Sequence, residues 1–451
     1  MTQQAQTSTL GDVRETLGFA LPVTLSRVGL LALVIVDTIM TGRLGANELA
    51  YYALAMAFML PMMMVGVGVL MGTVVLTAQA IGAGNAGECG GVWRVSMAHG
   101  AAYGGLAFAL CYVAEPFLLA TGQAPELALS ASGVMMMFSW GMPAMFLYFA
   151  TSFFLEGISR PLPGVIVMLF ANLLNAGLNW IFIYGAGGWT PAMGAEGAAL
   201  ATTIVRWAMF LSLIIYCLWQ LDSRHYGIRG AIADARQIGR RLRRIGYPMA
   251  LGVALESTSF SAMTLFAGLL GAAHIAGYQI AMNLNALGFM FALGFATVAS
   301  VRVGHAVGRR DQPSVRAAGW VSVGLAAPIL VAVGMVYGLS AHSLAAVYTG
   351  DPDVLAIAVP AILMTAIVII PDGIQGVLGG ALRGAADVWP ATIFYVIAFW
   401  FIMVPLGYYL GVLKQGGALG LVAAILVGTI IASLMLAVRF HIVSGRDTGR
   451  I

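Results

Sequence analysis

Three acidic residues interrupt long apolar stretches of the sequence. Asp37 sits in LLALVIVDTIM, Glu256 in MALGVALESTSFSAM, and Asp372 in IVIIPDGIQGVL directly after a proline. A carboxyl group inside a membrane costs on the order of 2.5–3.5 kcal/mol and is a functional candidate by default. Burial favours its neutral form, so such a group can load and release a proton. Each acid is therefore a candidate proton or sodium site, and the alternative is a carboxyl group that only ties helices together.

A polar stretch could supply partners for the first acid. MLFANLLNAGLNWIFIYG places Asn172, Asn175 and Asn179 on one helical face at i, i+3 and i+7. Thr202, in the next apolar stretch, could face them. We predict that Asn175, Asn179 and Thr202 hydrogen-bond Asp37 and tune its proton affinity. The alternative is that these asparagines only join neighbouring helices.

A second polar patch, GYQIAMNLNALGF, contains Tyr278, Gln279, Asn283 and Asn285. Gln279 and Asn283 share one helical face at i, i+4. We predict that Tyr278, Gln279 and Asn283 line a polar cleft for substrate, with helix packing as the alternative. The 25 methionines would suit loosely specific binding of apolar cations, or they simply face lipid.

Other reactive residue types are scattered. Cys89, Cys111 and Cys217 lie far apart without metal-ligand spacing, and the six histidines are dispersed as well. No phosphate-binding glycine loop is present, so ATP-driven transport is not expected. Arg206 lies inside an apolar stretch and either snorkels or pairs with an acid, and the sequence does not identify its partner.

Composition defines the elements that carry these residues. Of the 451 residues, 60% are hydrophobic and only 9% are charged, whereas a soluble domain has about 25% charged residues. The long apolar runs lack alternation and predict an all-α polytopic membrane protein of twelve transmembrane helices. The predicted spans are 16–40, 47–78, 94–120, 126–151, 161–185, 195–220, 242–270, 274–304, 314–340, 352–378, 388–411 and 416–442.

Most arginines lie in alternate connections between these spans. With both termini in the cytoplasm, only Arg43 and Lys414 fall outside, which agrees with the positive-inside rule. The arginines predicted to be cytoplasmic are Arg14, Arg94, Arg160, Arg224, Arg229, Arg236, Arg240, Arg241, Arg243, Arg244, Arg309, Arg310, Arg316, Arg383, Arg439, Arg446 and Arg450. The net charge of +4 is not a nucleic-acid signature, because these residues flank membrane spans.

The sequence repeats itself. A shift of 226 residues aligns Pro22 with Pro248, Tyr52 with Tyr278, and Leu44-Gly45-Ala46 with Leu270-Gly271-Ala272; a shift of 228 aligns Thr121-Gly122 with Thr349-Gly350 and Pro143 with Pro371. We predict two parallel six-helix lobes, 1–220 and 242–451, joined by a cytoplasmic linker, 221–241. Transporters commonly bind substrate between such halves. The acids do not repeat: Met263 stands opposite Asp37, Leu30 opposite Glu256, and Ala144 opposite Asp372.

In order and spacing, the motifs of the whole chain resemble the multidrug and toxic compound extrusion (MATE) transporters, particularly their NorM-like bacterial branch. The motifs are VDTIMTGRLGANELA, AQAIGAGN, LEGISRP, GAEGAALATTI, AGYQIAMNLNALGF, VRVGHAVGRRD and LRGAADVWP. The resemblance implies two six-helix bundles forming a V-shaped central cleft, in the bacterial cytoplasmic (inner) membrane. It also implies efflux of small-molecule drugs, chiefly organic cations, in exchange for protons or sodium by a monomer without a cofactor.

The same resemblance implies roles for individual residues. Asp37 matches a first-span carboxylate linked to proton-driven release, with Asn175 and Thr202 as its polar partners. Asn179 stands where some relatives carry aspartate. Glu256 and Asp372 match second-lobe carboxylates implicated in cation binding, with sodium as the candidate metal. The coupling ion stays open, and the alternatives are an exporter or flippase of lipid-linked or metabolite cargo and a membrane-embedded enzyme, for which no catalytic constellation is present.

Overall fold

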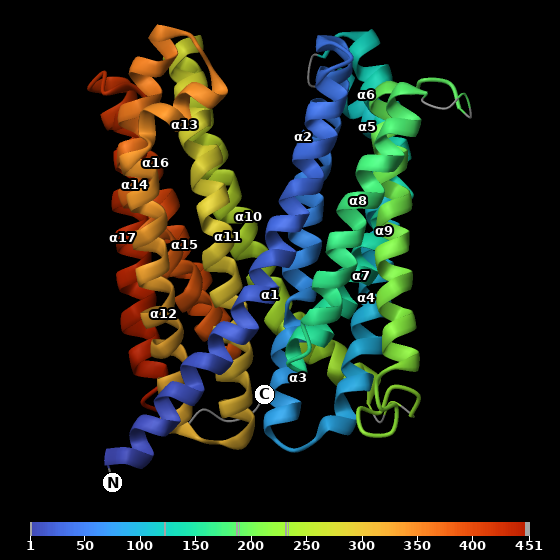
Figure 1. Ribbon diagram of the computed structural model, residues 1–451, viewed down its shortest axis with the longest axis vertical. Helices are drawn as coiled ribbons and strands as arrows, with labels where there is room; N and C mark the ends of the chain where they lie inside the picture. The colour runs from blue at the N-terminus through green and yellow to red at the C-terminus, as the bar shows by residue number, and fades with distance from the viewer. Residues whose placement is uncertain are drawn as a thin grey trace. The chain divides into compact units, whose positions relative to one another are not determined.

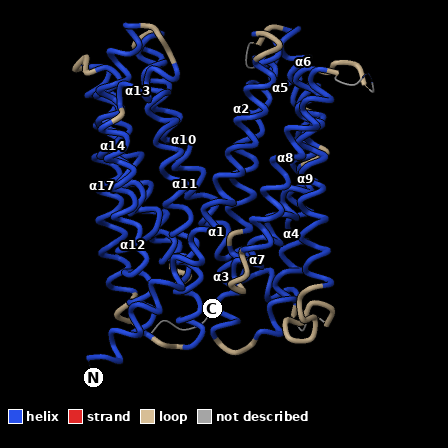
Figure 2. Tube along the Cα trace, in the orientation of Figure 1, coloured by secondary structure: helices blue, strands red, loops and turns tan. Residues whose placement is uncertain are grey.

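The structure, a computed structural model, describes residues 2–120, 123–185, 188, 190–230, 232 and 234–446, without the side chains of residues 2–17, 46 and 272. Within these ranges the chain forms helices joined by short turns, and it contains no strand (Figure 2). This confirms the all-α prediction. The repeat match at Thr121-Gly122, Arg450 and the side chain of Arg14 lie outside the described residues.

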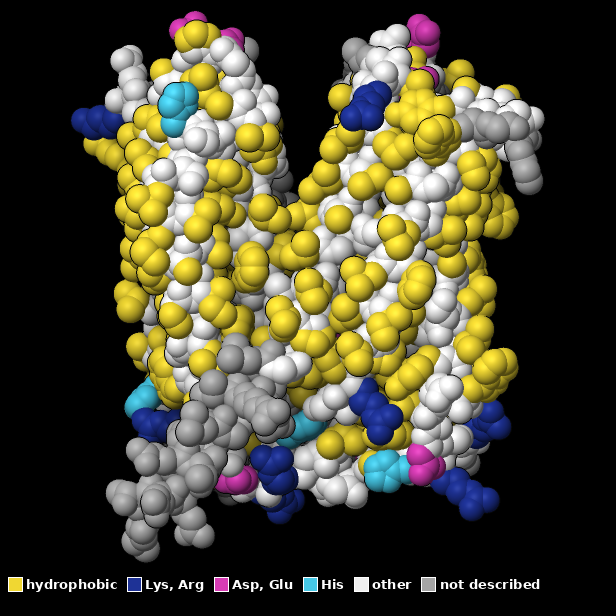
Figure 3. Space-filling view, in the orientation of Figure 1, with side chains coloured by type: hydrophobic (Ala, Val, Ile, Leu, Met, Phe, Trp, Pro, Cys, Tyr) yellow, Lys and Arg dark blue, Asp and Glu magenta, His cyan; other side chains and the backbone are white. Residues whose placement is uncertain are grey.

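The helices have the length and composition of membrane spans. Among the described residues, ten helices are long and apolar enough to cross a membrane, and two bent pairs bring the number to twelve if each pair is one span. The bent pairs are Ala86–Cys111 with Ala114–Ala120, at 55°, and Pro125–Ser139 with Met142–Gly157, at 43°. Hydrophobic side chains cover most of the visible lateral surface, with charged side chains mainly toward the ends (Figure 3). This is the surface expected of a polytopic membrane protein.

The chain divides into two compact units. Unit 1 comprises Met1–Thr24, Gly82–Gly84 and Leu251–Ile451, and unit 2 comprises Leu25–Ile81 and Asn85–Ala250. Two long helices, α1 (Thr2–Gly42) and α10 (Ala235–Leu269), therefore contribute to both units. Because α10 begins at Ala235, residues 235–241 of the predicted linker are helical; Ala231 and Ala233 lie outside the described residues.

Unit 2 is a bundle in which α4 packs against α7, and α9 packs against α6, α7 and α8 (Figure 1). Hydrogen bonds attach α8 to α1: Asn172 Nδ2 donates to the carbonyl of Gly29 at 3.1 Å, and the Tyr184 hydroxyl donates to that of Met40 at 2.8 Å. Besides its parts of α1 and α10, unit 2 contains α2 (Ala46–Leu70), α3 (Gly72–Gly82), η1 (Ala86–Glu88), α4 (Cys89–Cys111), α5 (Ala114–Ala120), α6 (Pro125–Ser139), α7 (Met142–Gly157), α8 (Leu162–Tyr184) and α9 (Gly194–Trp219).

Unit 1 is built around α14, which packs against α11, α12 and α17. In Figure 1, α1 begins and α17 ends at the same end of this unit. Its further helices are α11 (Ala272–Arg309), α12 (Gln312–Leu339), α13 (Ala341–Tyr348), α14 (Pro352–Gly384), α15 (Val388–Tyr395), η3 (Val396–Met403), α16 (Val404–Gly407), η4 (Tyr408–Leu413) and α17 (Gly417–Val443). Asp311 caps α12 by accepting hydrogen bonds from the Ser314 amide and hydroxyl, and these bonds lower the pKa of Asp311.

Matching backbone geometry supports the sequence repeat. Gly45 and Gly271, which the 226-residue shift aligns, precede α2 and α11 with φ of 140° and 103°. Gly194 and Gly417 begin α9 and α17 with φ of 58° and 60°. Glycine adopts positive φ without the steric cost that other residues meet. The two units therefore share turns at corresponding points of the chain.

Candidate functional site

Asp37 lies at a junction of four helices in unit 2 and is 2% exposed. Its Oδ2 accepts a hydrogen bond from the Thr202 hydroxyl of α9 at 2.6 Å, and its Oδ1 accepts one from Asn179 Nδ2 of α8 at 2.7 Å. A longer contact, 3.4 Å, joins the Tyr52 hydroxyl of α2 to Oδ2. The structure thus brings Asp37 together with two of its three predicted partners and with a tyrosine that sequence reasoning did not select.

Asn175 hydrogen-bonds the two residues that donate to Asp37, Thr202 and Asn179. Its Nδ2 donates to the Thr202 hydroxyl oxygen at 3.3 Å, and its Oδ1 accepts from Asn179 Nδ2 at 3.2 Å. The side chains of Asn175 and Asn179 are fully buried. Asn179 Nδ2 can only donate to Asp37, whereas the Thr202 and Tyr52 hydroxyls can donate or accept, so the cluster can hold the carboxyl group charged or neutral. Protonation would place a donor on one carboxyl oxygen, and the Thr202 or Tyr52 hydroxyl could turn to accept from it.

Glu256 and Asp372 form a second cluster, in unit 1. Gln375 Nε2 donates to Glu256 Oε1 at 3.1 Å and to Asp372 Oδ1 at 3.3 Å, so one amide bridges both acids. Asn285 Nδ2 of α11 donates to Asp372 Oδ2 at 3.0 Å. Asp372 and Gln375 are buried, and Glu256 is partly buried. The cluster therefore joins α10, α11 and α14.

Two amide oxygens of this second cluster lack a partner. Asn285 Oδ1 and Gln375 Oε1 are both buried and accept no hydrogen bond. Buried polar atoms are normally satisfied, so an unpaired oxygen beside two carboxylates is a reason to look for a cation. Carboxylate and amide oxygens are the donors that hard cations take. Among the described residues no group of three or more His, Cys, Asp and Glu could hold a metal ion; the oxygen donors of this cluster come from two carboxylates and two amides.

The predicted substrate residues do not form one surface. Gln279 and Asn283 are exposed and lie one turn apart on α11, as their spacing predicted. Tyr278 is 0% exposed and lies in the core of unit 1, so it cannot line the same surface. Asn285, on the other side of α11, belongs instead to the Asp372 cluster.

Besides Tyr52, sequence reasoning missed three residues that matter here. Gln375 follows Asp372 by three positions on the same helix, a spacing that places both on one face. Arg27 and Glu156 form a buried ion pair, with Arg27 Nη2 at 2.9 Å and 3.0 Å from the two carboxylate oxygens. Glu156 is therefore a fourth buried acid, although its position near a predicted span end suggested a solvent-exposed group. The sequence feature that could have pointed to this pair is the position of Arg27, a cation inside the first apolar stretch.

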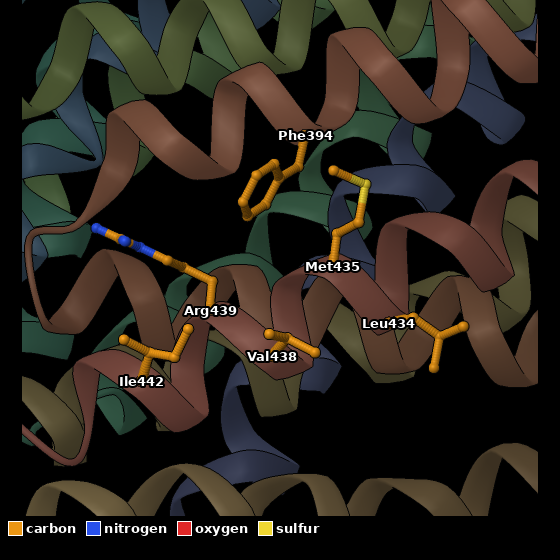
Figure 4. A pocket seen from close by; sticks show the side chains of 6 residues that line it. All are labelled: Phe394, Leu434, Met435, Val438, Arg439 and Ile442. Atoms are coloured by element: carbon orange, nitrogen blue, oxygen red, sulfur yellow. The ribbon is translucent and has the colours of Figure 1, made fainter.

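A separate apolar groove of about 370 Å³ lies in unit 1 between α15 and α17. Figure 4 shows its lining, Phe394, Leu434, Met435, Val438, Arg439 and Ile442. Arg439 is held by Asp387 through two hydrogen bonds of 2.7 Å and 2.9 Å. None of the candidate site residues lines this groove.

Duplicated helix bundles with polar sites buried in the membrane are the arrangement typical of one class of protein, the membrane transporters. The MatE family model matches the chain twice, at residues 22–181 and 248–409, and the starts of these matches reproduce the 226-residue repeat. The chain therefore belongs to the MatE family, the multidrug and toxic compound extrusion transporters, as its motifs predicted.

Individual relatives agree with this assignment. The probable multidrug resistance protein NorM of Caulobacter vibrioides is 35% identical, over 97% of this chain and 93% of the relative. The multidrug resistance protein MdtK of Pectobacterium atrosepticum is 29% identical, over 98% of each chain. The fold is similar to that of the Vibrio cholerae MATE transporter VcmN in the bent form, with a TM-score of 0.88 at 18% identity, over 97% of this chain and 98% of that one.

Proposed function

We propose that this chain is a secondary active transporter that exports small-molecule drugs, chiefly organic cations, in exchange for protons and sodium. Its relatives are named as multidrug resistance proteins. The observation that carries the proposal is that each unit holds one buried carboxylate cluster, built on a single acid in unit 2 and on two acids bridged by one amide in unit 1. The protein would act as a monomer in the bacterial cytoplasmic membrane, with both termini in the cytoplasm.

The cluster in unit 2 is the proposed proton site. Asp37 accepts hydrogen bonds from Thr202, Asn179 and Tyr52, so this cluster offers a cation one carboxylate whose two oxygens are already engaged. A proton needs only one carboxylate oxygen. Its arrival turns an acceptor into a donor, which competes with the hydrogen bonds that hold α1 to α8 and α9. Proton uptake would thus loosen a junction between helices.

The cluster in unit 1 is the proposed sodium site. Glu256 and Asp372 supply negative charge, and Asn285 and Gln375 supply the two unpaired amide oxygens. These residues come from α10, α11 and α14, so a bound ion would draw three helices together. Sodium, as cargo of the transport cycle, would enter from the side where it is concentrated and leave as drug binds.

The test is drug-dye efflux from proteoliposomes under an imposed proton gradient or an imposed sodium gradient. We expect Asp37→Asn to abolish proton-driven efflux, and Glu256→Gln and Asp372→Asn to abolish sodium-driven efflux. The matched control is Asp353→Asn, which alters an exposed acid near the start of α14 and should transport normally. If all three site variants transport like the control under both gradients, the coupling role of the buried acids is refuted.

A further inference from the structure

Arg206 is a buried cation whose hydrogen-bond acceptors are two sulfur atoms. It lies in α9 and is 9% exposed. Its Nη1 lies 3.7 Å from Met142 Sδ, its Nη2 lies 3.8 Å from Met63 Sδ, and its guanidinium carbon lies 5.3 Å from the centre of the Phe138 ring. We call Met63, Met142 and Phe138 the cage. Among the described residues no carboxylate forms a salt bridge with Arg206, although a guanidinium has five donors that suit oxygen.

Two residues of the cage, Phe138 and Met142, flank the bend between α6 and α7 in the fourth membrane span. Phe138 is the last residue but one of α6, Met142 is the first residue of α7, and the two helices meet at an angle of 43°. Gly141 lies at the break, where an added Cβ would come within 3.0 Å of Arg206 Cδ. A side chain at position 141 would therefore crowd the arginine stem.

Neighbouring residues of α9 satisfy the carbonyls that the break exposes. The Thr203 hydroxyl donates to the Met137 carbonyl at 2.7 Å, and Trp207 Nε1 donates to the Trp140 carbonyl at 3.0 Å. Arg206, between them in the chain, makes no comparable bond in the described part of the protein. The break is thus already supported without the guanidinium, which leaves that group free to change partners.

Asp37 is the acid within reach of Arg206. Arg206 follows Thr202, which bonds Asp37, by four residues on one helical face. Side chains lean toward the helix N-terminus, and four residues rise about 6 Å, so the arginine side chain can reach toward Asp37. Asp37 from α1 and Tyr52 from α2 are the titratable groups that act on Arg206, whereas α6 and α7 present the ring and a thioether.

The corresponding position of unit 1 shows that the fold does not need an arginine here. Aligning Gly194 with Gly417, which share positive φ, places Thr429 opposite Arg206. The Thr429 hydroxyl bonds its own helix, at the Ile425 carbonyl. The repeat counterpart of the broken span, α14, is one continuous helix. The cage and its arginine are therefore additions specific to unit 2.

We propose that Arg206 is a tethered competitor of the exported organic cation for the cage. When Asp37 has released its proton to water, its carboxylate draws the guanidinium away and frees the cage. Thioethers and an aromatic face suit a lipophilic or quaternary cation, so the drug's positive group binds there. When Asp37 takes up a proton, Arg206 returns to the cage and expels the drug. This inference rests on the proposed proton-coupled export and names its substrate site.

Movement of Arg206 can be followed by NMR of ¹³C-methyl methionine in the full-length protein. We expect the Met63 and Met142 signals, assigned through Met63→Leu and Met142→Leu, to shift between acidic and alkaline pH. Asp37→Asn should hold them at their acidic positions, and Arg206→Met should remove the shift. Met135, buried elsewhere on α6, is the control signal and should not move.

Competition can be measured by binding of tetraphenylphosphonium. Wild-type protein should bind it about tenfold more weakly at acidic pH, within the usual range of coupling between two sites. Arg206→Met should bind it equally at both pH values, and Arg206→Lys should retain the dependence.

If the wild-type Met63 and Met142 signals ignore pH while proton-driven efflux persists, the competitor role is wrong and the proposed function stands. If wild-type protein exports no drug under either gradient, the proposed function itself fails, whatever the methionine signals do.

Discussion

Replacing Gln375 by leucine should weaken sodium binding without altering the charge of the site. Leucine is close to glutamine in size, so the change removes the amide and leaves the packing of α14 largely intact. The amide has two tasks: its Nε2 bridges Glu256 and Asp372, and its Oε1 is an unpaired buried acceptor. The first task orients both carboxylates, and the second supplies a ligand.

The size of the effect follows from these contacts. A hydrogen bond to a charged group contributes about 1.5–3 kcal/mol. Loss of a residue that orients metal ligands typically lowers affinity about 10–100-fold, which is about 1.4–2.8 kcal/mol at 1.4 kcal/mol per tenfold. The two estimates agree, so we expect sodium affinity to fall by one to two orders of magnitude.

Sodium-dependent thermal stabilisation of the purified protein measures this loss. At a sodium concentration of about 100 times the wild-type dissociation constant, the ion stabilises the folded state by about 2.7 kcal/mol. A variant that binds 100-fold more weakly gains only about 0.4 kcal/mol under the same conditions. Choline chloride at equal ionic strength separates specific binding from a general salt effect.

Gln220→Leu is the matched control, because Gln220 is exposed after the last residue of α9 in unit 2. It should respond to sodium as the wild type does. Equal sodium stabilisation of Gln375→Leu and the wild type would refute the assignment of this amide to the ion site. A wild type that responds no more to sodium than to choline would refute the sodium site altogether.

Three further predictions follow from the described contacts. Thr202→Val removes the shortest hydrogen bond to Asp37, at 2.6 Å. Proton-driven efflux from proteoliposomes should therefore fall, and its pH profile should move to higher pH. Stabilisation by sodium, measured by melting, should be unchanged. Glu156→Gln leaves Arg27 buried without its countercharge and should lower stability by about 3–5 kcal/mol; the double variant Arg27→Met, Glu156→Met should recover most of it in a melting experiment. Asp311→Ala removes the cap of α12 and should cost about 1 kcal/mol, seen as a small decrease in melting temperature without loss of transport.

The spans could be predicted from the sequence because their signal is local. A run of apolar residues has to be long enough to cross the bilayer, and the ends of α8, predicted as 161–185, lie at Leu162–Tyr184. The repeat was equally visible, because glycines with positive φ recur at the same turns. The start of α10 was placed too late, at 242, because its first turns are basic and exposed while the helix is continuous.

Side-chain partners were harder to predict, because they depend on which helices pack together. Asn179 and Thr202 reach Asp37 across α8 and α9, and their polarity in apolar stretches was a sufficient signal. Gln375 gave a weaker signal, since one amide after an acid is common on any helix. The site of Arg206 could not be found at all, because the break at Gly141 that creates it depends on contact with α9.

The helix junction that holds Asp37 in unit 2 has an apolar counterpart in unit 1. The repeat places Met263 opposite Asp37 and Gly407 opposite Asn179. Met263 is fully buried, and its thioether occupies the space beside Gly407 where a Cβ would otherwise lie. One unit thus fills this junction with a methionine against a glycine, and the other fills it with a carboxylate against an amide.

The second cluster also has an apolar counterpart, but here the polar cluster lies in unit 1 and its apolar counterpart in unit 2. The repeat places apolar residues of unit 2 opposite its four members, Glu256, Asp372, Gln375 and Asn285: these are Leu30, Ala144, Leu147 and Met59. Ala144 and Met59 are fully buried, so an apolar version of this junction packs well. Both junctions therefore exist in a form that needs no buried charge.

Stability alone would favour the apolar form of each junction, since burying a carboxylate costs more than burying a methyl group. Each polar cluster therefore persists in one unit at an energetic cost that packing does not require. If both clusters served one ion, the same donor set would be expected at both. Instead a single carboxylate accepts hydrogen bonds from three side chains in unit 2, while two carboxylates share the amide of Gln375 in unit 1. That difference in chemistry is the strongest reason to expect two different coupling ions, a proton in unit 2 and sodium in unit 1.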